Sequence, residues 1–210
     1  MSTATTTTAG IMDLLKDRTA EHHRRAEQQP LQQALVRGTA TREQYASWLA
    51  QMMHVHAALE SEIVAHVSVE PRLRIVTEEQ HGAPRLASDL RALGHDPVQA
   101  RPSDATIAVC ERIRRAARSN PVTLLGYHYV LEGSKNGNRF IAMALRRGLG
   151  LQPGVADTYL DPYGEQQRAK WQAFRGAMGA QAYNDAETEA VMYAAAEMFD
   201  GVSAVCASLG

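Results

Sequence analysis

Residues 41–66 read TREQYASWLAQMMHVHAALESEIVAH, and this stretch decides the fold class. Its stripe of mostly apolar side chains repeats every three or four residues, which is the spacing of one face of an α-helix. The stripe consists of Tyr45, Trp48, Leu49, Met52, Val55, His56, Leu59 and Ile63. Because Thr41 and Gln44 form a capping-box pair at its start, the sequence predicts a helix over 41–66.

The same spacing continues along most of the chain, and the alternating patterns of half-buried strands are missing. A second capping-box pair, Asn184 with Glu187, begins a C-terminal helix. Prolines mark other starts, at Asn120-Pro121 and Asp161-Pro162, because proline fits a first helical turn but breaks a helix interior. The predicted helices span 11–28, 31–37, 41–66, 71–94, 103–118, 121–148, 162–179 and 185–208.

Composition narrows the class of protein. The chain has 210 residues with 45% apolar content, enough to bury the core of one domain. Its 22 basic and 23 acidic residues give a net charge of -1, so no global field attracts nucleic acid or an anionic membrane. Two cysteines without CxxC spacing, Cys110 and Cys206, indicate neither a disulfide framework nor a zinc site.

The terminal segments suggest a soluble protein. Met1–Gly10 lacks the basic start and apolar run of a secretory signal, and no apolar run approaches the roughly 18 residues of a membrane-spanning helix. We expect a disordered leader over 1–10 and an all-α, single-domain multi-helix bundle over 11–210. The cysteine usage fits a reducing cytoplasm.

The first predicted helix carries two adjacent histidines, His22 and His23. Its inner face runs from Leu15 through Thr19 to Ala26 and passes between them, so one imidazole should point inward. Periodicity does not say which. A single inward histidine is more often a hydrogen-bonded core residue than a metal ligand.

The sixth predicted helix is interrupted in composition by Gly133–Asn138, which reads GSKNGN. Each interior glycine costs about 1 kcal/mol relative to alanine, so we expect a compensating role. Gly133 and Gly137 share one face, where a planar ligand or another backbone could approach without meeting a Cβ atom. A kinked helix over a planar ligand and close helix packing are both consistent with this segment.

Together these segments resemble the heme oxygenase family over nearly the whole chain. Residues 14–27, LLKDRTAEHHRRAE, are similar to the family's proximal helix. The resemblance implies that His23 is the axial ligand of the heme iron and that Lys16 faces a heme propionate.

Two further blocks extend the resemblance. Residues 54–63, HVHAALESEI, resemble a family block in which tyrosine often holds the position of His56. Residues 171–178, WQAFRGAM, resemble another block and imply that Arg175 binds a propionate. His128, between two tyrosines, either contacts the heme edge or completes the core.

The sixth helix resembles the family's distal helix, and its LEGS sequence is similar to bacterial members. The resemblance implies that Gly133, Ser134, Gly137 and Asn138 line the oxygen-binding side. Many members carry Gly-Gly where this chain has Gly137-Asn138, and Ser134 replaces an acidic residue of the animal enzymes. The asparagine would either crowd the pocket or donate a hydrogen bond to bound oxygen.

The implied activity is O2-dependent cleavage of heme b, as both substrate and cofactor, to biliverdin, ferrous iron and carbon monoxide. Distal water could be held by Ser134, Asn136, Asn138 or His56. No flavin or nicotinamide fingerprint is present, so electrons should come from a ferredoxin or flavoprotein reductase. The docking candidates are Arg24, Arg25, Arg146 and Arg147. We expect a monomer or weak dimer.

Two alternatives stay open. A non-catalytic heme-binding or heme-sensing protein of the same fold is favoured by the Gly137-Asn138 departure. A helical di-iron oxidase or thiaminase-like hydrolase is the other. A di-iron site needs Glu-x-x-His pairs from two helices, and only Glu78 with His81 has that spacing.

Overall fold

The computed structural model describes residues 10–210, which contain helices and no strand. The α-helices are α1 (Ile11–Glu27), α2 (Pro30–Arg37), α3 (Arg42–His66), α4 (Ala83–Ala92), α5 (Asp104–Ser119), α6 (Leu124–Leu149), α7 (Gln167–Gly179) and α8 (Asp185–Ala207). Short 3-10 helices are η1 (Pro71–Ile75), η2 (Glu78–Gln80), η3 (Pro97–Gln99), η4 (Pro121–Thr123) and η5 (Gly164–Gln166). The predicted all-α class is confirmed.

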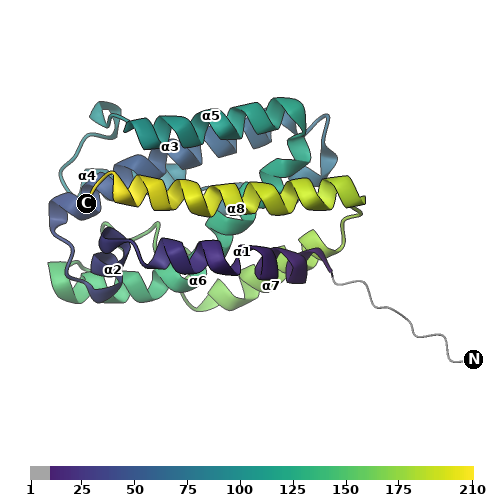
Figure 1. The fold of residues 1–210 in the computed structure, drawn as a ribbon. Coiled ribbons are helices and arrows are strands. Elements are labelled where there is room, and N and C mark those ends of the chain that lie inside the picture. The colour runs from purple at the N-terminus through teal and green to yellow at the C-terminus, as the bar shows by residue number, and fades with distance from the viewer. Residues whose placement is uncertain (1–9) are drawn as a thin grey trace, which may run out of the picture.

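The helices form a bundle with α8 at its centre. In Figure 1, α3 and α5 lie above α8, and α1, α2, α6 and α7 lie below it. α8 packs against α1, α5 and α6. A Cβ atom on Gly126 would overlap the carbonyl oxygen of Val191, so this glycine allows α6 to approach the backbone of α8 closely.

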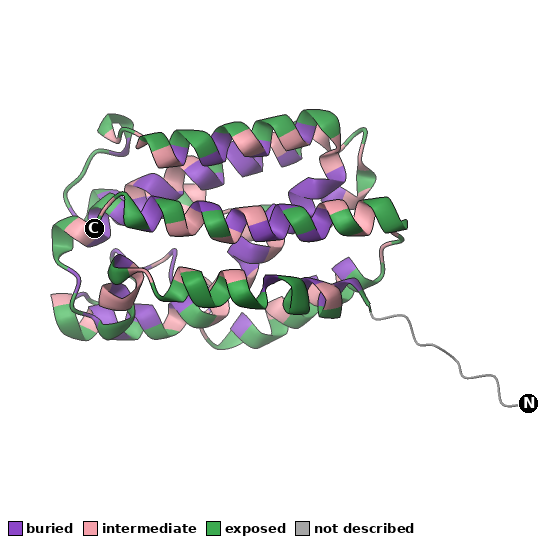
Figure 2. Ribbon diagram, viewed as in Figure 1, coloured by how far each residue is buried: buried purple, intermediate pink, exposed green. Residues whose placement is uncertain are grey.

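Burial follows the predicted apolar stripes. The buried positions lie on the helix sides that face the middle of the bundle (Figure 2), and they form one contiguous apolar cluster. Leu15, Leu49 and Leu59 are fully buried within it. The predicted leader over 1–10 lies outside the described residues except for Gly10, so the division into leader and domain stays a prediction.

Both predicted capping boxes are present. Thr41 Oγ1 accepts from the backbone N–H of Gln44 at 3.1 Å, and Gln44 Oε1 accepts from the N–H of Thr41 at 2.9 Å. Asn184 and Glu187 exchange the same two bonds, each at 2.9 Å. Capping of this kind satisfies N–H groups that have no partner within the helix, so α3 and α8 begin where the sequence predicts.

The predicted helix over 71–94 is wrong. The chain makes η1 and η2 there, and α4 begins only at Ala83. Pro84 has no N–H and its ring excludes a preceding helical turn, so a helix can start beside it but cannot pass through it. The N–H groups of Gly82 and Ala83 donate instead to the Glu60 carboxylate, at 2.6 and 3.2 Å.

Two other predicted starts are corrected. Pro121–Thr123 forms η4, so α6 begins at Leu124. Asp161-Pro162 does not begin a helix, because Asp161 binds Arg146 at 3.2 Å and Gly164 takes a positive φ of 53°. A left-handed residue interrupts a right-handed helix, which delays α7 to Gln167.

One helix differs from the expectation that none could cross a membrane. α8 is long and apolar enough to do so by length and composition, with a mean hydropathy of 1.3 over 18 residues. Half of that window (50%) is buried inside the bundle. This is weak evidence for a membrane span, because a core helix of a soluble protein passes the same test.

Candidate functional site

A cavity of about 550 Å³ lies between α1, α2, α3, α6 and α8. Its wall is mostly apolar, with a few polar groups that come chiefly from α1 and α6. The lining residues are His23, Ala26, Glu27, Gln32, Val36, Trp48, Met52, Val130, Leu131, Gly133, Ser134, Asn136, Gly137, Asn138, Phe140, Ile141, Tyr159, Phe199 and Val202. Small-molecule sites usually have this character, so the cavity is the candidate site.

The two adjacent histidines of α1 face different neighbours. His23 lines the cavity, and its ring meets the ring of Phe199 edge-on, with 5.3 Å between centroids. Its Nδ1 atom lies 3.6 Å from Glu27 Oε2, one turn along α1. His22 Nδ1 lies 2.8 Å from Asp200 on α8, outside the cavity lining. A ligand in the cavity can therefore reach His23.

The segment Gly133–Asn138 forms one wall of the cavity, within a continuous α6. A Cβ atom on Gly137 would meet nothing within 4 Å, so the backbone there is open. A Cβ atom on Gly133 would lie 3.2 Å from the indole of Trp171 on α7. The backbone is thus open at Gly137, whereas Gly133 packs closely against α7. The predicted kink stays a prediction, since a helix can bend without losing its assignment.

The polar side chains of this segment are partly satisfied by the protein. Ser134 Oγ donates to the carbonyl oxygen of Leu131 at 2.8 Å and accepts from Asn138 Nδ2 at 3.4 Å. Asn136 Nδ2 donates to the carbonyl oxygen of Gly133 at 2.9 Å. The side-chain oxygen of Asn138, Oδ1, has no hydrogen-bond partner within residues 10–210, which leaves it available to a molecule in the cavity.

Tyr159 lines the cavity and begins a chain of buried hydrogen bonds. Its hydroxyl lies 3.0 Å from His56 Nε2, and His56 Nδ1 lies 3.0 Å from Glu60 Oε1. Burial lowers the pKa of His56, which keeps the imidazole neutral near pH 7. Although burial opposes the charge of Glu60, the hydrogen bonds from His56 and two backbone N–H groups lower the pKa of this carboxyl overall. A neutral His56 therefore donates from Nδ1 to Glu60 and accepts at Nε2 from Tyr159.

The structure does not bring every predicted site residue into the cavity lining. His56 meets the cavity only through Tyr159. His128 is buried and packs edge-on against Phe174, with 5.4 Å between ring centroids. Lys16 is exposed on α1 and Arg175 is half-buried on α7, two helices that are in contact.

The sequence reasoning misses several lining residues, among them Trp48, Phe199 and Tyr159. Trp48 and Phe199 belong to apolar stripes, which predict a core position and cannot distinguish it from a cavity wall. Tyr159 lies between α6 and α7, where no periodicity predicts its direction. The arrangement of five helices is needed to bring these three residues and His23 into the wall of one cavity.

A comparison with models of protein families identifies the family. The sequence model described as heme oxygenase matches residues 9–207. The chain belongs to the heme oxygenase family. No curated protein sequence matches it.

Solved structures of heme oxygenases share the fold. The enzyme of Leptospira interrogans superimposes with a TM-score of 0.87 at 22% identity, over 95% of this chain and 100% of that one. Heme oxygenase-1 of Synechocystis sp. PCC6803, in complex with heme, gives 0.87 at 20% identity, over 96% and 92% of the two chains. A domain of unknown function with a heme oxygenase-like fold from Shewanella denitrificans gives 0.76 at 15% identity, over 97% and 93%.

Proposed function

We propose that the protein is a heme oxygenase, which cleaves heme b with O2 and external electrons to biliverdin, ferrous iron and carbon monoxide. The observation that carries the proposal is that His23 and the open backbone at Gly137 line one cavity. An iron porphyrin of this kind needs one axial nitrogen and a second face left free for oxygen. An imidazole and a glycine backbone fit these two requirements. Family membership supports the proposal.

His23 would hold the iron through Nε2, because its Nδ1 atom faces Glu27. A carboxylate near Nδ1 fixes the tautomer and the orientation of a metal-binding imidazole and raises its basicity. The His23 side chain is 53% exposed, so a ligand can reach the ring. Bound heme would supply the iron that activates O2 and the meso carbon that is oxidised.

The α6 wall would present no strongly metal-coordinating side chain to the oxygen-binding face of the heme. Its polar groups would hold water there. Gly137 contributes backbone only, and Ser134 and Asn138 offer a hydroxyl and an amide. Water held by these groups can donate protons without competing for the iron as a histidine or cysteine would.

The chain from Tyr159 through His56 to Glu60 would orient the Tyr159 hydroxyl beside this water. The Tyr159 hydroxyl is kept protonated, since burial raises its pKa. The Tyr159 hydroxyl donates to His56 Nε2 and His56 Nδ1 donates to Glu60, over two hydrogen bonds of 3.0 Å each, so the Tyr159 oxygen keeps a lone pair that can accept a hydrogen bond from this water. The chain thus connects the cavity to the protein interior.

Lys16 and Arg175 would pair with the two heme propionates. Desolvated carboxylates need cationic partners, and paired partners would fix the rotation of the porphyrin in the cavity. That rotation decides which meso carbon is cleaved. His128 has no direct role in this scheme, because it packs against Phe174 outside the cavity lining.

Electrons would come from a ferredoxin or a flavoprotein reductase that docks on the protein surface. The protein would act in the cytoplasm, as a monomer or weak dimer. Three of the four arginines predicted for docking already form ion pairs, which reduces the charge they offer to a partner. These pairs are Arg24 with Glu21, Arg25 with Asp200 and Arg146 with Asp157. Arg147 is exposed and is the strongest of the four candidates.

A turnover experiment tests the function. The ferric heme complex is reduced under nitrogen and then exposed to O2 and a ferredoxin reductase system, with catalase present to remove peroxide. We expect loss of the Soret band, a biliverdin spectrum and release of carbon monoxide. An oxy-heme spectrum that stays unchanged over many minutes would contradict the proposed function.

A non-catalytic heme-binding protein is the second candidate, favoured by the buried Asn138 amide in the cavity wall. If the amide blocks turnover, Asn138→Gly should convert a stable oxy complex into one that forms biliverdin. If the wild-type protein already turns over, the same variant tests whether the amide tunes the rate. The comparison therefore separates the two functions.

A further inference from the structure

The side of α6 that faces away from the cavity carries a buried ion pair. Within residues 130–141, only Glu132, Lys135 and Arg139 are absent from the cavity lining, and their spacing places them on one face. The side chains of Glu132 and Lys135 are 0% and 1% exposed, and Lys135 Nζ lies 2.6 Å from Glu132 Oε2. The glycine segment therefore lies between the cavity and this pair.

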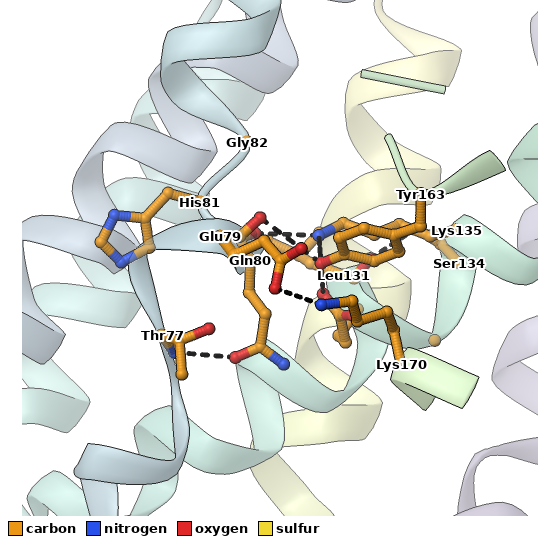
Figure 3. Close-up of polar contacts among 12 residues, drawn as sticks. Thr77, Glu79, Gln80, His81, Gly82, Leu131, Ser134, Lys135, Tyr163 and Lys170 are labelled. Carbon is orange, nitrogen blue, oxygen red and sulfur yellow. Dashed lines mark hydrogen bonds and ion pairs between the residues drawn. The ribbon is translucent and has the colours of Figure 1, made fainter. Parts of the chain in front are cut away.

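The lysine binds two other segments of the chain (Figure 3). Its amine donates to the carbonyl oxygen of Gln80 in η2 at 2.9 Å and to the Tyr163 hydroxyl at 3.0 Å. Beside it, Lys170 on α7 lies 2.6 Å from Glu79 of η2. Lys135 thus joins the back of α6 to η2 and to the segment before α7.

This arrangement is poor as a source of stability. Replacing a buried ion pair with apolar residues of similar volume is often neutral or stabilising, because both charges lose their hydration on burial. Glu132 Oε1 is buried without a hydrogen-bond partner among residues 10–210, a situation that costs about 1–3 kcal/mol. Unlike apolar packing, the directional hydrogen bonds of this pair fix the position and the rotation of α6.

The glycine segment needs such support. Its two glycines each lower helix stability by about 1 kcal/mol relative to alanine, and Gly137 has no neighbour on its open side. We propose that Glu132 and Lys135 are positioning residues, which hold residues 133–138 so that the Gly137 backbone and the Asn138 amide face the cavity. The inference rests on the proposed function only for the identity of the ligand.

The decisive variant is Glu132→Leu/Lys135→Met, which removes both charges together and keeps similar volumes. We expect a melting temperature close to wild type. In the heme-free protein, hydrogen exchange of the amides in 133–138 should become faster by about tenfold or more, because this part of α6 opens locally. In the ferrous complex with carbon monoxide, the C–O stretching band should shift or broaden.

The matched control is Arg72→Met, which breaks a half-buried ion cluster with Glu70 and Glu187 away from the cavity lining. It should lower stability and leave both signals unchanged. If the double variant does not fold, Tyr163→Phe decides the matter. It removes one bond to Lys135 and should raise exchange in 133–138 by about threefold.

Wild-type exchange in 133–138 together with a wild-type C–O band, in a folded double variant, would overturn the proposal. The exchange measurement needs no heme. Faster exchange in a protein that fails to bind heme would therefore refute the proposed function and leave the positioning role intact.

Discussion

His23 and Phe199 pack edge-on at an interplanar angle of 87°, which joins α1 to α8 at the cavity wall. His22 joins the same two helices outside the cavity through Asp200. An edge-on ring pair contributes about 0.5–1.5 kcal/mol beyond its buried area, so the contact orients the His23 imidazole before a ligand arrives. Adjacent histidines with separate partners can be distinguished by mutation.

His23→Ala should abolish the iron–imidazole stretching band in the resonance Raman spectrum of the ferrous heme complex. His22→Ala removes a 2.8 Å hydrogen bond to a half-exposed carboxylate, a contact worth about 0–1 kcal/mol, and should keep that band. The opposite pattern would show that the wrong histidine has been assigned.

Gly137→Ala should stabilise the heme-free protein by about 1 kcal/mol in urea unfolding, because the added methyl group meets no atom and alanine favours the helix. Gly137→Leu should fill part of the cavity and weaken heme binding in a spectroscopic titration. Gly133→Ala is the control, since its methyl group would press on Trp171 at 3.2 Å and gain less stability. Unchanged heme affinity in Gly137→Leu would place the heme elsewhere.

Tyr159→Phe should keep the shape of the cavity and the heme affinity while lowering turnover by about tenfold or more, because the cavity loses the hydroxyl that would position the proton-donating water. Tyr45→Phe is a matched control. It loses a buried 2.7 Å hydrogen bond to the carbonyl oxygen of Ala156, at a cost of about 1 kcal/mol, and does not line the cavity. Equal turnover in the two variants would argue against a role of Tyr159 in positioning water.

The free energy of unfolding should decrease as the pH is lowered through mildly acidic values, because two histidines are buried. Burial lowers the pKa of His56 and lowers that of His128 well below its usual value. Below about pH 6.5 the unfolded chain therefore binds protons that the native state does not, and each histidine contributes up to about 1.4 kcal/mol per pH unit.

His128→Phe should reduce that slope and raise stability below about pH 6.5, because the His128 Nε2 atom is buried and has no hydrogen-bond partner in the described part of the chain. Urea unfolding followed by circular dichroism between roughly pH 5 and 7.5 measures the effect. The same slope in variant and wild type would mean that His128 does not titrate in this window.

The fold is readable from sequence where caps and apolar stripes coincide. Thr41 and Asn184 each bring a capping box to the start of a long stripe, and α3 and α8 begin beside them. The helix predicted over 71–94 is wrong because the apolar stripe continues across Pro84, whereas a helical backbone cannot continue through this proline. There the partner of the free N–H groups is Glu60, which is distant in sequence and invisible to a local pattern.

The site is only partly readable for a related reason. The motif around His23 and the glycines at 133 and 137 are local features, and the structure gathers them in one cavity. Tyr159 and Lys135 carry no such signal. A lysine on a helix is expected at the surface. Glu132 precedes it by three residues on the same helix, but only the tertiary fold brings Gln80 and Tyr163 to its amine and buries the pair.

The indole of Trp171 against Gly133 has an optical consequence. Trp48 and Trp171 are the chain's two tryptophans, and one lines the cavity while the other contacts its glycine wall. A porphyrin entering this space would accept excitation energy from both rings, so ultraviolet emission should be almost extinguished as the cavity fills. The protein therefore carries its own fluorescent reporter of occupancy, and ligand entry can be timed by stopped flow without a label.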